Sequence, residues 1–224
     1  MSWRAALFCA LLVPLQATAQ DYVSSQGRLS DDDFYHLVAC TAPPGGECQD
    51  DLVRWAPNDA ANLTVAVVDI KPGFPEEKVD PAQAALDSAI AQINAAGAAL
   101  RLTRVTPQDD PHITVHFWDQ DEDDIITGMG LTGVDGDHLG AGYVYIWWDG
   151  DKNLSRGVIM LSRDIAHGDI ASIMLEELTQ STGLLTDIDN PWYDTRSIFA
   201  ENTNWVTKLQ PQDIMALRRH YPNP

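Results

Sequence analysis

The amino-acid sequence predicts an α/β (α+β) fold in which helices pack on a twisted, mixed β-sheet. Segments rich in β-branched residues alternate with segments whose apolar residues recur at helical spacing. Along the chain these segments follow the order β-α-β-β-β-β-α, then a loop and a last helix. The chain has 224 residues, of which 45% are hydrophobic. Such a chain can bury one core, and its length is typical of a single domain with a small extension.

The N-terminus predicts export from the cytoplasm. One positive charge in residues 1–4 precedes a short apolar run and the small-x-small sequence Ala17-Thr18-Ala19. These are the features of a secretory signal peptide. We therefore expect residues 1–19 to be removed by cleavage between Ala19 and Gln20, which places the mature protein in the periplasm or outside the cell. No later segment is long and apolar enough to span a bilayer.

The charge of the chain excludes two classes of partner. The formal net charge is −19 at neutral pH, and loss of Arg4 with the signal peptide makes it one unit more negative. Nucleic acids and anionic membranes are bound by Lys and Arg residues that neutralise phosphates. We therefore expect no nucleic-acid partner and no anionic membrane surface. An acidic chain remains compatible with cation binding.

Residues 20–58 are expected to form an N-terminal extension. The part up to Ser30 is polar and expected to be mobile, and a helix is predicted over Asp31–Ala39, with Ser30 as its N-cap. Cys40 and Cys48 flank a Pro-Pro-Gly-Gly turn. An even pair of cysteines in an exported chain predicts a disulfide. The alternative, a metal–thiolate pair, would need two further ligands at suitable spacing.

Residues 59–224 are expected to form the main domain, and five of its segments predict strands. The first of them is rich in β-branched residues, as buried strands are. The others are short and separated by turns rich in Pro, Gly and Asp. The expected strands are Leu63–Ile70, Leu100–Val105, His112–Trp118, Tyr143–Trp148 and Gly157–Leu161.

Three helices are expected in the same domain. The first has Asp80 as its N-cap and Pro81 at its first helical position, and Gly97 is its expected C-cap. The second spans about Asp169–Thr182, and the third spans about Pro211–His220. Each has apolar residues on one face, so each can pack against the sheet or its loops.

The second of these helices carries the most informative motif of the chain. Residues 175–184 have the sequence Leu-Glu-Glu-Leu-Thr-Gln-Ser-Thr-Gly-Leu, which resembles the metzincin zinc-protease pattern H-E-x-x-H-x-x-G-x-x-H. In this alignment Glu177 keeps the general-base position and Gly183 keeps the glycine. The three histidine positions are taken by Glu176, Gln180 and Thr186.

Further segments are similar to the matrixins, a branch of the metzincins, over roughly residues 54–222. Ser197-Ile198-Phe199 stands where metzincins have their Met-turn, and Leu209–Leu217 is similar to the start of the last matrixin helix. The whole chain also resembles an uncharacterised family of exported proteobacterial proteins, a domain of unknown function. The resemblance implies a zincin-like fold with a degenerate active-site motif. The alternative is that Asp169–Thr182 is an amphipathic core helix.

The altered motif predicts an oxygen-rich site in place of a zinc site. Glu176 and Gln180 are one helical turn apart and face the same way. Thr186 is a poor ligand, whereas the adjacent Asp187 is a better one. Catalytic zinc strongly favours imidazole ligands, and an oxygen set suits calcium, magnesium or manganese instead. We therefore expect no tight zinc binding at these residues.

The resemblance also implies where calcium would bind. A run of acids from Asp119 and a second group from Asp135 occupy the place of the matrixin loop that holds structural ions. The run does not match an EF-hand, because it lacks Gly at position six and Glu at position twelve. The alternative is a solvated acidic face. The candidate calcium ligands are Asp119, Asp121, Asp135 and Asp137.

Two functions remain open from the sequence. In the first, the chain is a zinc-less pseudo-protease that binds a peptide, protein or envelope component. The binding site is the groove that corresponds to the substrate groove of metzincins, and it is lined by Glu176, Gln180, Thr186 and Asp187. In the second, it is a divergent hydrolase or peptidase in which Glu176, Glu177 and Asp187 act with an oxygen-bound metal or none. The first is preferred, because Glu177 has no metal-bound water to deprotonate.

Overall fold

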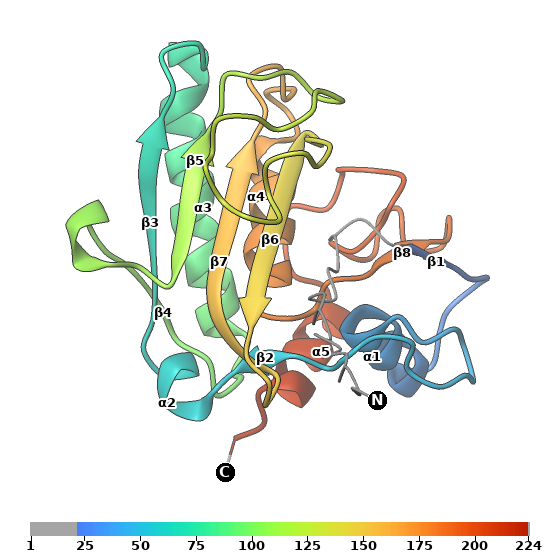
Figure 1. The fold of residues 1–224 in the computed structure, drawn as a ribbon. Coiled ribbons are helices and arrows are strands. Elements are labelled where there is room, and N and C mark those ends of the chain that lie inside the picture. Colours follow the sequence, from blue (N-terminus) through green and yellow to red (C-terminus); the bar gives the residue numbers. More distant parts are fainter. Residues whose placement is uncertain (1–21, 224) are drawn as a thin grey trace, which may run out of the picture.

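The computed structural model describes residues 22–223 of the chain (Figure 1). The predicted signal peptide and the cleavage site between Ala19 and Gln20 lie outside these residues. None of the helices within residues 22–223 is long and apolar enough to cross a bilayer. The fold is a mixed α/β arrangement of five helices and a largely parallel six-stranded sheet, with a second sheet of two short strands.

The six-stranded sheet has its strands in the order β4-β3-β5-β7-β6, and β2 pairs with the start of β7. All neighbours are parallel except β6, which runs antiparallel to β7 at one edge. Their apolar side chains alternate between the two faces, as the period of a strand requires. The strands are β2 (Arg54–Trp55), β3 (Leu63–Ile70), β4 (Leu102–Arg104), β5 (Ile113–Phe117), β6 (Gly142–Trp148) and β7 (Asn153–Leu161).

Different segments of the chain pack against the two faces of this sheet. Helices α3 (Glu76–Ala95) and α4 (Ile170–Gln180) lie side by side behind the strands in Figure 1 and pack in the main hydrophobic core. On the other face, residues 119–141 contribute Ile126, Val134 and Leu139 to a smaller core over β6 and β7. This second face is therefore covered over parts of β6 and β7 and left more open toward β3.

The start of α3 differs from the prediction. Its N-cap is Pro75 and not Asp80, so Pro81 lies inside the helix. Phe74 and Val79 have the spacing of a hydrophobic staple around this N-cap, and both contribute to the main core. The staple sets the start of the helix, and Pro81 removes one intrahelical hydrogen bond without ending it.

The prediction of a mobile segment up to Ser30 was wrong. Residues Tyr22–Ser24 form β1, which pairs in parallel with β8 (Asp187–Asp189) in the two-stranded sheet. The side-chain amide of Asn190 then donates to the carbonyl of Gly27 at 2.8 Å. The polar composition of the segment gave no sign of this strand, because its partner is distant in the sequence.

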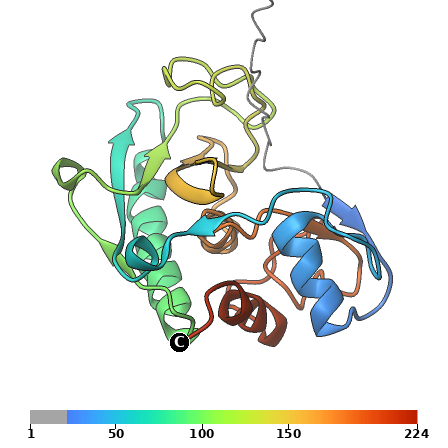
Figure 2. The same cartoon turned by 60° about the horizontal axis from the view of Figure 1, so that its bottom comes forward.

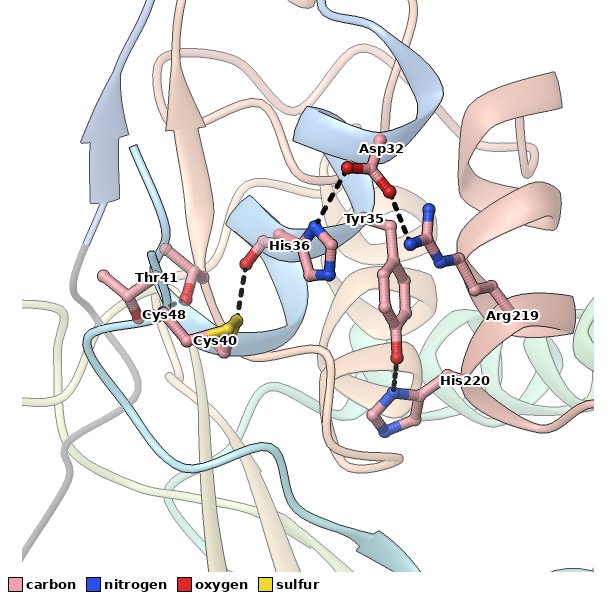
Figure 3. Close-up of a disulfide and its surroundings, with 9 residues drawn as sticks. Asp32, Tyr35, His36, Cys40, Thr41, Cys48, Arg219 and His220 are labelled. Carbon is pink, nitrogen blue, oxygen red and sulfur yellow. Dashed lines mark hydrogen bonds and ion pairs between the residues drawn. A yellow bond between two sulfur atoms is a disulfide. The ribbon is translucent and has the colours of Figure 1, made fainter. Parts of the chain in front are cut away.

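The disulfide between Cys40 and Cys48 is confirmed, with the two Cα atoms 5.1 Å apart (Figure 3). Cys40 ends α1 (Asp31–Cys40), whose predicted N-cap Ser30 accepts from the Asp33 amide. The disulfide therefore fixes the residues that follow α1 to its last turn.

Helix α1 packs against α5 (Pro211–His220), and Figure 2 shows the two helices next to each other. The Tyr35 hydroxyl lies 3.3 Å from Nδ1 of His220, and Arg219 forms an ion pair with Asp32 (Figure 3). The first helix of the predicted extension is thus held by the last helix of the chain. The short helix α2 (Pro57–Ala60) connects β2 to β3.

Candidate functional site

Helix α4 carries the altered motif among residues that are mostly buried. Leu175 and Leu178 are buried in the main core, as predicted. Glu176 and Gln180 are one turn apart and therefore share another side of the helix. The helix ends at Gln180 and not at the predicted Thr182, because the chain turns at the C-cap Ser181.

Gln180 and Glu176 both bond to Asp187. The Gln180 side-chain nitrogen Nε2 donates to Oδ1 of Asp187 at 2.8 Å. The Glu176 carboxyl shares a further hydrogen bond with the Asp187 carboxyl. Strand β8 holds Asp187 in place, since Asp187 is paired with Tyr22 of β1. The structure therefore brings these three predicted site residues together.

Thr186 lies on another side of the chain, against α1. Its side chain is buried, and its hydroxyl lies 2.9 Å from the Thr41 hydroxyl. Its amide donates to the carbonyl of Val38 at 3.2 Å. Thr186 therefore helps to fix the extension and does not join the group around Asp187. We call Glu176, Glu177, Gln180 and Asp187 the α4 site.

Glu177 is the unusual member of the α4 site. Its side chain is buried with only 8% exposed, and it makes no hydrogen bond within residues 22–223. It lies against the edge strand β6, where a Cβ on Gly142 would come within 2.3 Å of its Oε1. The absence of a side chain at Gly142 makes this approach possible. Its oxygens are not among the fully buried side-chain atoms without a partner, so the carboxyl reaches the surface beside β6 while most of the side chain is buried.

Burial raises the pKa of every carboxyl in the α4 site. It raises the pKa of both Glu176 and Glu177 well above the usual range, and the nearby Asp187 adds to the effect. Burial, together with the charge of Glu201, likewise raises the pKa of Asp187. The protonated forms of these carboxyls are therefore favoured, and a proton shared between Glu176 and Asp187 allows them to bond to each other.

The Ser197-Ile198-Phe199 turn lies against β8. The Phe199 carbonyl accepts from the amide of Ile188, the neighbour of Asp187, at 2.7 Å. Both Ile198 and Phe199 are buried in the main core, as predicted. The turn therefore supports the strand that carries Asp187.

Asp213 fixes this turn, and sequence reasoning missed it. Its carboxyl accepts from the Ser197 hydroxyl at 2.7 Å and from the amides of Ile198 at 3.3 Å and Gln210 at 2.8 Å. Burial raises its pKa to about 7 against the opposing effect of these bonds. The sequence feature that could have identified Asp213 is the capping box of α5, formed by Gln210 and Asp213.

Gly183 is required by the packing just after α4. Its φ is +102°, which L side chains rarely adopt, and a Cβ would lie 2.1 Å from the carbonyl oxygen of Val53. The backbone before β2 thus passes directly over this residue. Gly183 therefore has a structural role that does not depend on zinc.

The four candidate calcium ligands make separate contacts. Arg163 donates two hydrogen bonds to Asp121, at 2.6 and 2.5 Å, and the Tyr143 hydroxyl donates to Asp137 at 2.8 Å. Asp135 accepts from two backbone amides, and Asp119 is exposed. Within the part of the chain that the structure describes, no three His, Cys, Asp or Glu side chains are grouped so that they could hold a metal ion.

No protein-family model matches the chain, and no curated protein matches it either. The functional interpretation therefore depends on the residues of the α4 site and on their surroundings.

Proposed function

We propose that the chain is an exported metzincin-like domain that lacks zinc and works by binding a peptide or an envelope component beside α4. The observation that carries this proposal is the bonding of Glu176 and Gln180 to Asp187. These groups stand at or next to the positions that resemble zinc ligands, and they satisfy one another. A neutral amide and protonated carboxyls are poor zinc ligands.

The topology supports a zincin-like fold. Four parallel strands are followed at one edge by the antiparallel β6, and α4 contacts β6. The matrixin resemblance implies such a mixed sheet crossed by the motif helix. The position of Gly183 and of the Ser-Ile-Phe turn near the α4 site adds to this support.

The edge strand β6 supports peptide binding. Within residues 22–223, β6 pairs with β7 and with no other strand. Extended peptides bind such edges by adding a strand, and the backbone then supplies most of the hydrogen bonds. A peptide on this edge would pass Gly142, next to the buried carboxyl of Glu177. The Cys40–Cys48 disulfide supports an exported location.

Zinc titration tests the loss of the metal site. We expect little zinc binding by the natural protein in calorimetry, and binding once histidines replace Glu176, Gln180 and Asp187 together. The third histidine is placed at 187 because Thr186 is buried against α1. Tight zinc binding by the natural protein, lost in Glu176→Ala, would contradict the proposal.

Peptide binding is tested on an array of extended peptides combined with a cleavage assay. We expect peptides to bind without being cut, and Glu177→Gln to change their affinity. The control is Glu77→Gln, which makes the same change at an exposed position of α3. Equal effects of the two variants would argue against binding at the α4 site.

The hydrogen-bonded carboxyl pair favours a second candidate function, a hydrolase that needs no metal. In such an enzyme the pair would share one proton, so that an ionised Asp187 takes a proton from water while a protonated Glu176 donates one to the leaving group. Hydrolysis of a peptide library in the presence of a chelator, abolished by Glu176→Gln, would establish this function. The absence of cleavage under these conditions leaves the binding function.

A further inference from the structure

A cavity of about 490 Å³ lies on the sheet face opposite α3 and α4. The two register irregularities of the six-stranded sheet both border it. One leaves Val68 unpaired between β3 and β5, and the other leaves Ser155 unpaired between β6 and β7. Both of these residues line the cavity. β-Bulges re-aim side chains and are frequent beside functional sites.

The loop between β4 and β5 forms another wall of this cavity. Because β3 lies between these two strands in the sheet, the loop must cross β3 (Figure 1). It contributes Pro107, Asp110 and Pro111 to the lining. Together with Val68, the two prolines give the cavity apolar walls. Such a mixture of apolar walls and a few polar groups is typical of small-molecule sites.

His112 supplies a hydrogen-bond donor in the cavity. The Thr64 amide donates to Nδ1 of His112 at 3.2 Å, and the Thr64 hydroxyl lies 2.7 Å from the same nitrogen. The hydroxyl in turn accepts from the His112 amide at 3.1 Å. Since Nδ1 accepts from the Thr64 amide, the ring proton of the neutral imidazole is on Nε2. Nε2 has no hydrogen-bond partner within residues 22–223.

Arg156 supplies a positive charge in the same cavity. It is exposed and makes no ion pair with the acidic residues in the described part of the chain. Its guanidinium stands over the Trp147 ring, 5.5 Å from the centroid. An arginine presents a fork of donors that matches a carboxylate. The neighbouring Ser155 hydroxyl donates to the carbonyl of Trp147, so its oxygen is left as an acceptor.

His116 adds no charge to the lining near neutral pH. Burial lowers the pKa of His116 to about 4, and its Nε2 lies 3.1 Å from the Thr114 hydroxyl. The positive charge of the cavity therefore comes from Arg156, whereas Asp110 brings a negative charge to its wall. This balance suits a ligand with one negative charge better than a dianion.

We propose that this cavity binds a small organic monocarboxylate. The carboxylate lies on Arg156 and His112, and the apolar body of the ligand packs against Val68 and the two prolines. The site is separate from the α4 site, because the sheet lies between them. It does not depend on the function proposed for α4.

The proposal is tested by titrating the natural protein with benzoate while recording amide and histidine-ring NMR signals. We expect saturable shifts at His112 and Ser155. Benzamide has the same shape as benzoate without the charge, and we expect it to bind at least about tenfold more weakly than benzoate. We expect inorganic phosphate to bind at least about tenfold more weakly than benzoate as well. Arg156→Gln should weaken benzoate binding by at least about tenfold. Arg101→Gln, at an exposed arginine that forms no ion pair within residues 22–223, should leave it unchanged.

Several results would overturn the proposal. They are the absence of saturable shifts at millimolar benzoate, equal binding of benzamide, tighter binding of phosphate, and an unchanged affinity in Arg156→Gln. The amide spectrum of Arg156→Gln shows directly whether the variant is folded. The comparison of benzoate with benzamide and phosphate needs no variant at all.

Discussion

Replacing Glu177 by leucine removes a carboxyl that is 8% exposed and makes no hydrogen bond within residues 22–223. Ile173 and Gly142 lie beside it, and the Asp187 carboxyl is near enough to raise its pKa, so a leucine also removes a repulsion between acidic groups. Full burial of a polar group without a partner costs about 1–3 kcal/mol, and this is an upper bound for Glu177, whose oxygens reach the surface. We therefore expect Glu177→Leu to raise the free energy of unfolding at pH 7 by at most about 1–3 kcal/mol.

The size of this gain should depend on pH. Burial raises the pKa of Glu177 above its usual value of 4.5. Below pH 4.5 the carboxyl is protonated in both states, so the natural protein and the variant differ by a constant amount. Above this pH the unfolded state ionises while the folded state keeps its proton, and the natural protein loses stability relative to the variant. The slope is at most about 1.4 kcal/mol per pH unit.

Urea unfolding of both proteins between pH 4 and pH 8 measures this dependence. Glu177→Gln should remove the same slope while keeping a polar side chain, and Glu77→Leu, at an exposed position of α3, should change neither stability nor slope. A less stable Glu177→Leu variant would contradict the reasoning. A difference from the natural protein that stays constant from pH 5 to pH 8 would contradict it as well.

Three further substitutions test the surroundings of the site by thermal or urea unfolding. Gly183→Ala should destabilise the protein by more than about 2 kcal/mol through backbone strain and a steric clash, whereas Gly150→Ala, with open space around it, should have little effect. Phe199→Ala should cost about 3–5 kcal/mol because the ring is fully buried, and a cost below 1 kcal/mol would contradict its place in the core. Serines at Cys40 and Cys48 should cost about 2–3 kcal/mol, and unchanged stability would show that the disulfide contributes nothing.

The sequence correctly predicted the bounds of those helices and strands that are set by residues close by in the sequence. Strand β3 and helix α5 have the predicted bounds, Leu63–Ile70 and Pro211–His220. The short strands β1 and β8 were missed because their stability comes from pairing with each other across the whole chain. The start of α3 was placed too late because Pro81 is a frequent first residue of helices, and the staple before it was not considered.

The candidate site was predictable to a similar extent. Helical spacing places Glu176 and Gln180 on one side of α4, and chemistry favours Asp187 over Thr186 as their neighbour. The buried position of Glu177 depends on the approach of β6 at Gly142, a contact between distant segments that the motif does not encode. The cavity on the other face of the sheet could not be predicted from the sequence either, because the bulges that border it arise from the register of strand pairs.

The carboxyl of Glu177 is the group on which the proposed binding function can be separated from a role in folding. Glu176 and Asp187 bond to each other, so their burial is partly compensated. Glu177 makes no such bond within residues 22–223, and it packs beside Ile173 and Gly142. A position that breaks a folding rule without a gain in stability is expected at a functional site. A leucine that raises stability and weakens peptide binding together would assign Glu177 to function, whereas a stabilised variant with unchanged binding would leave the carboxyl without a role.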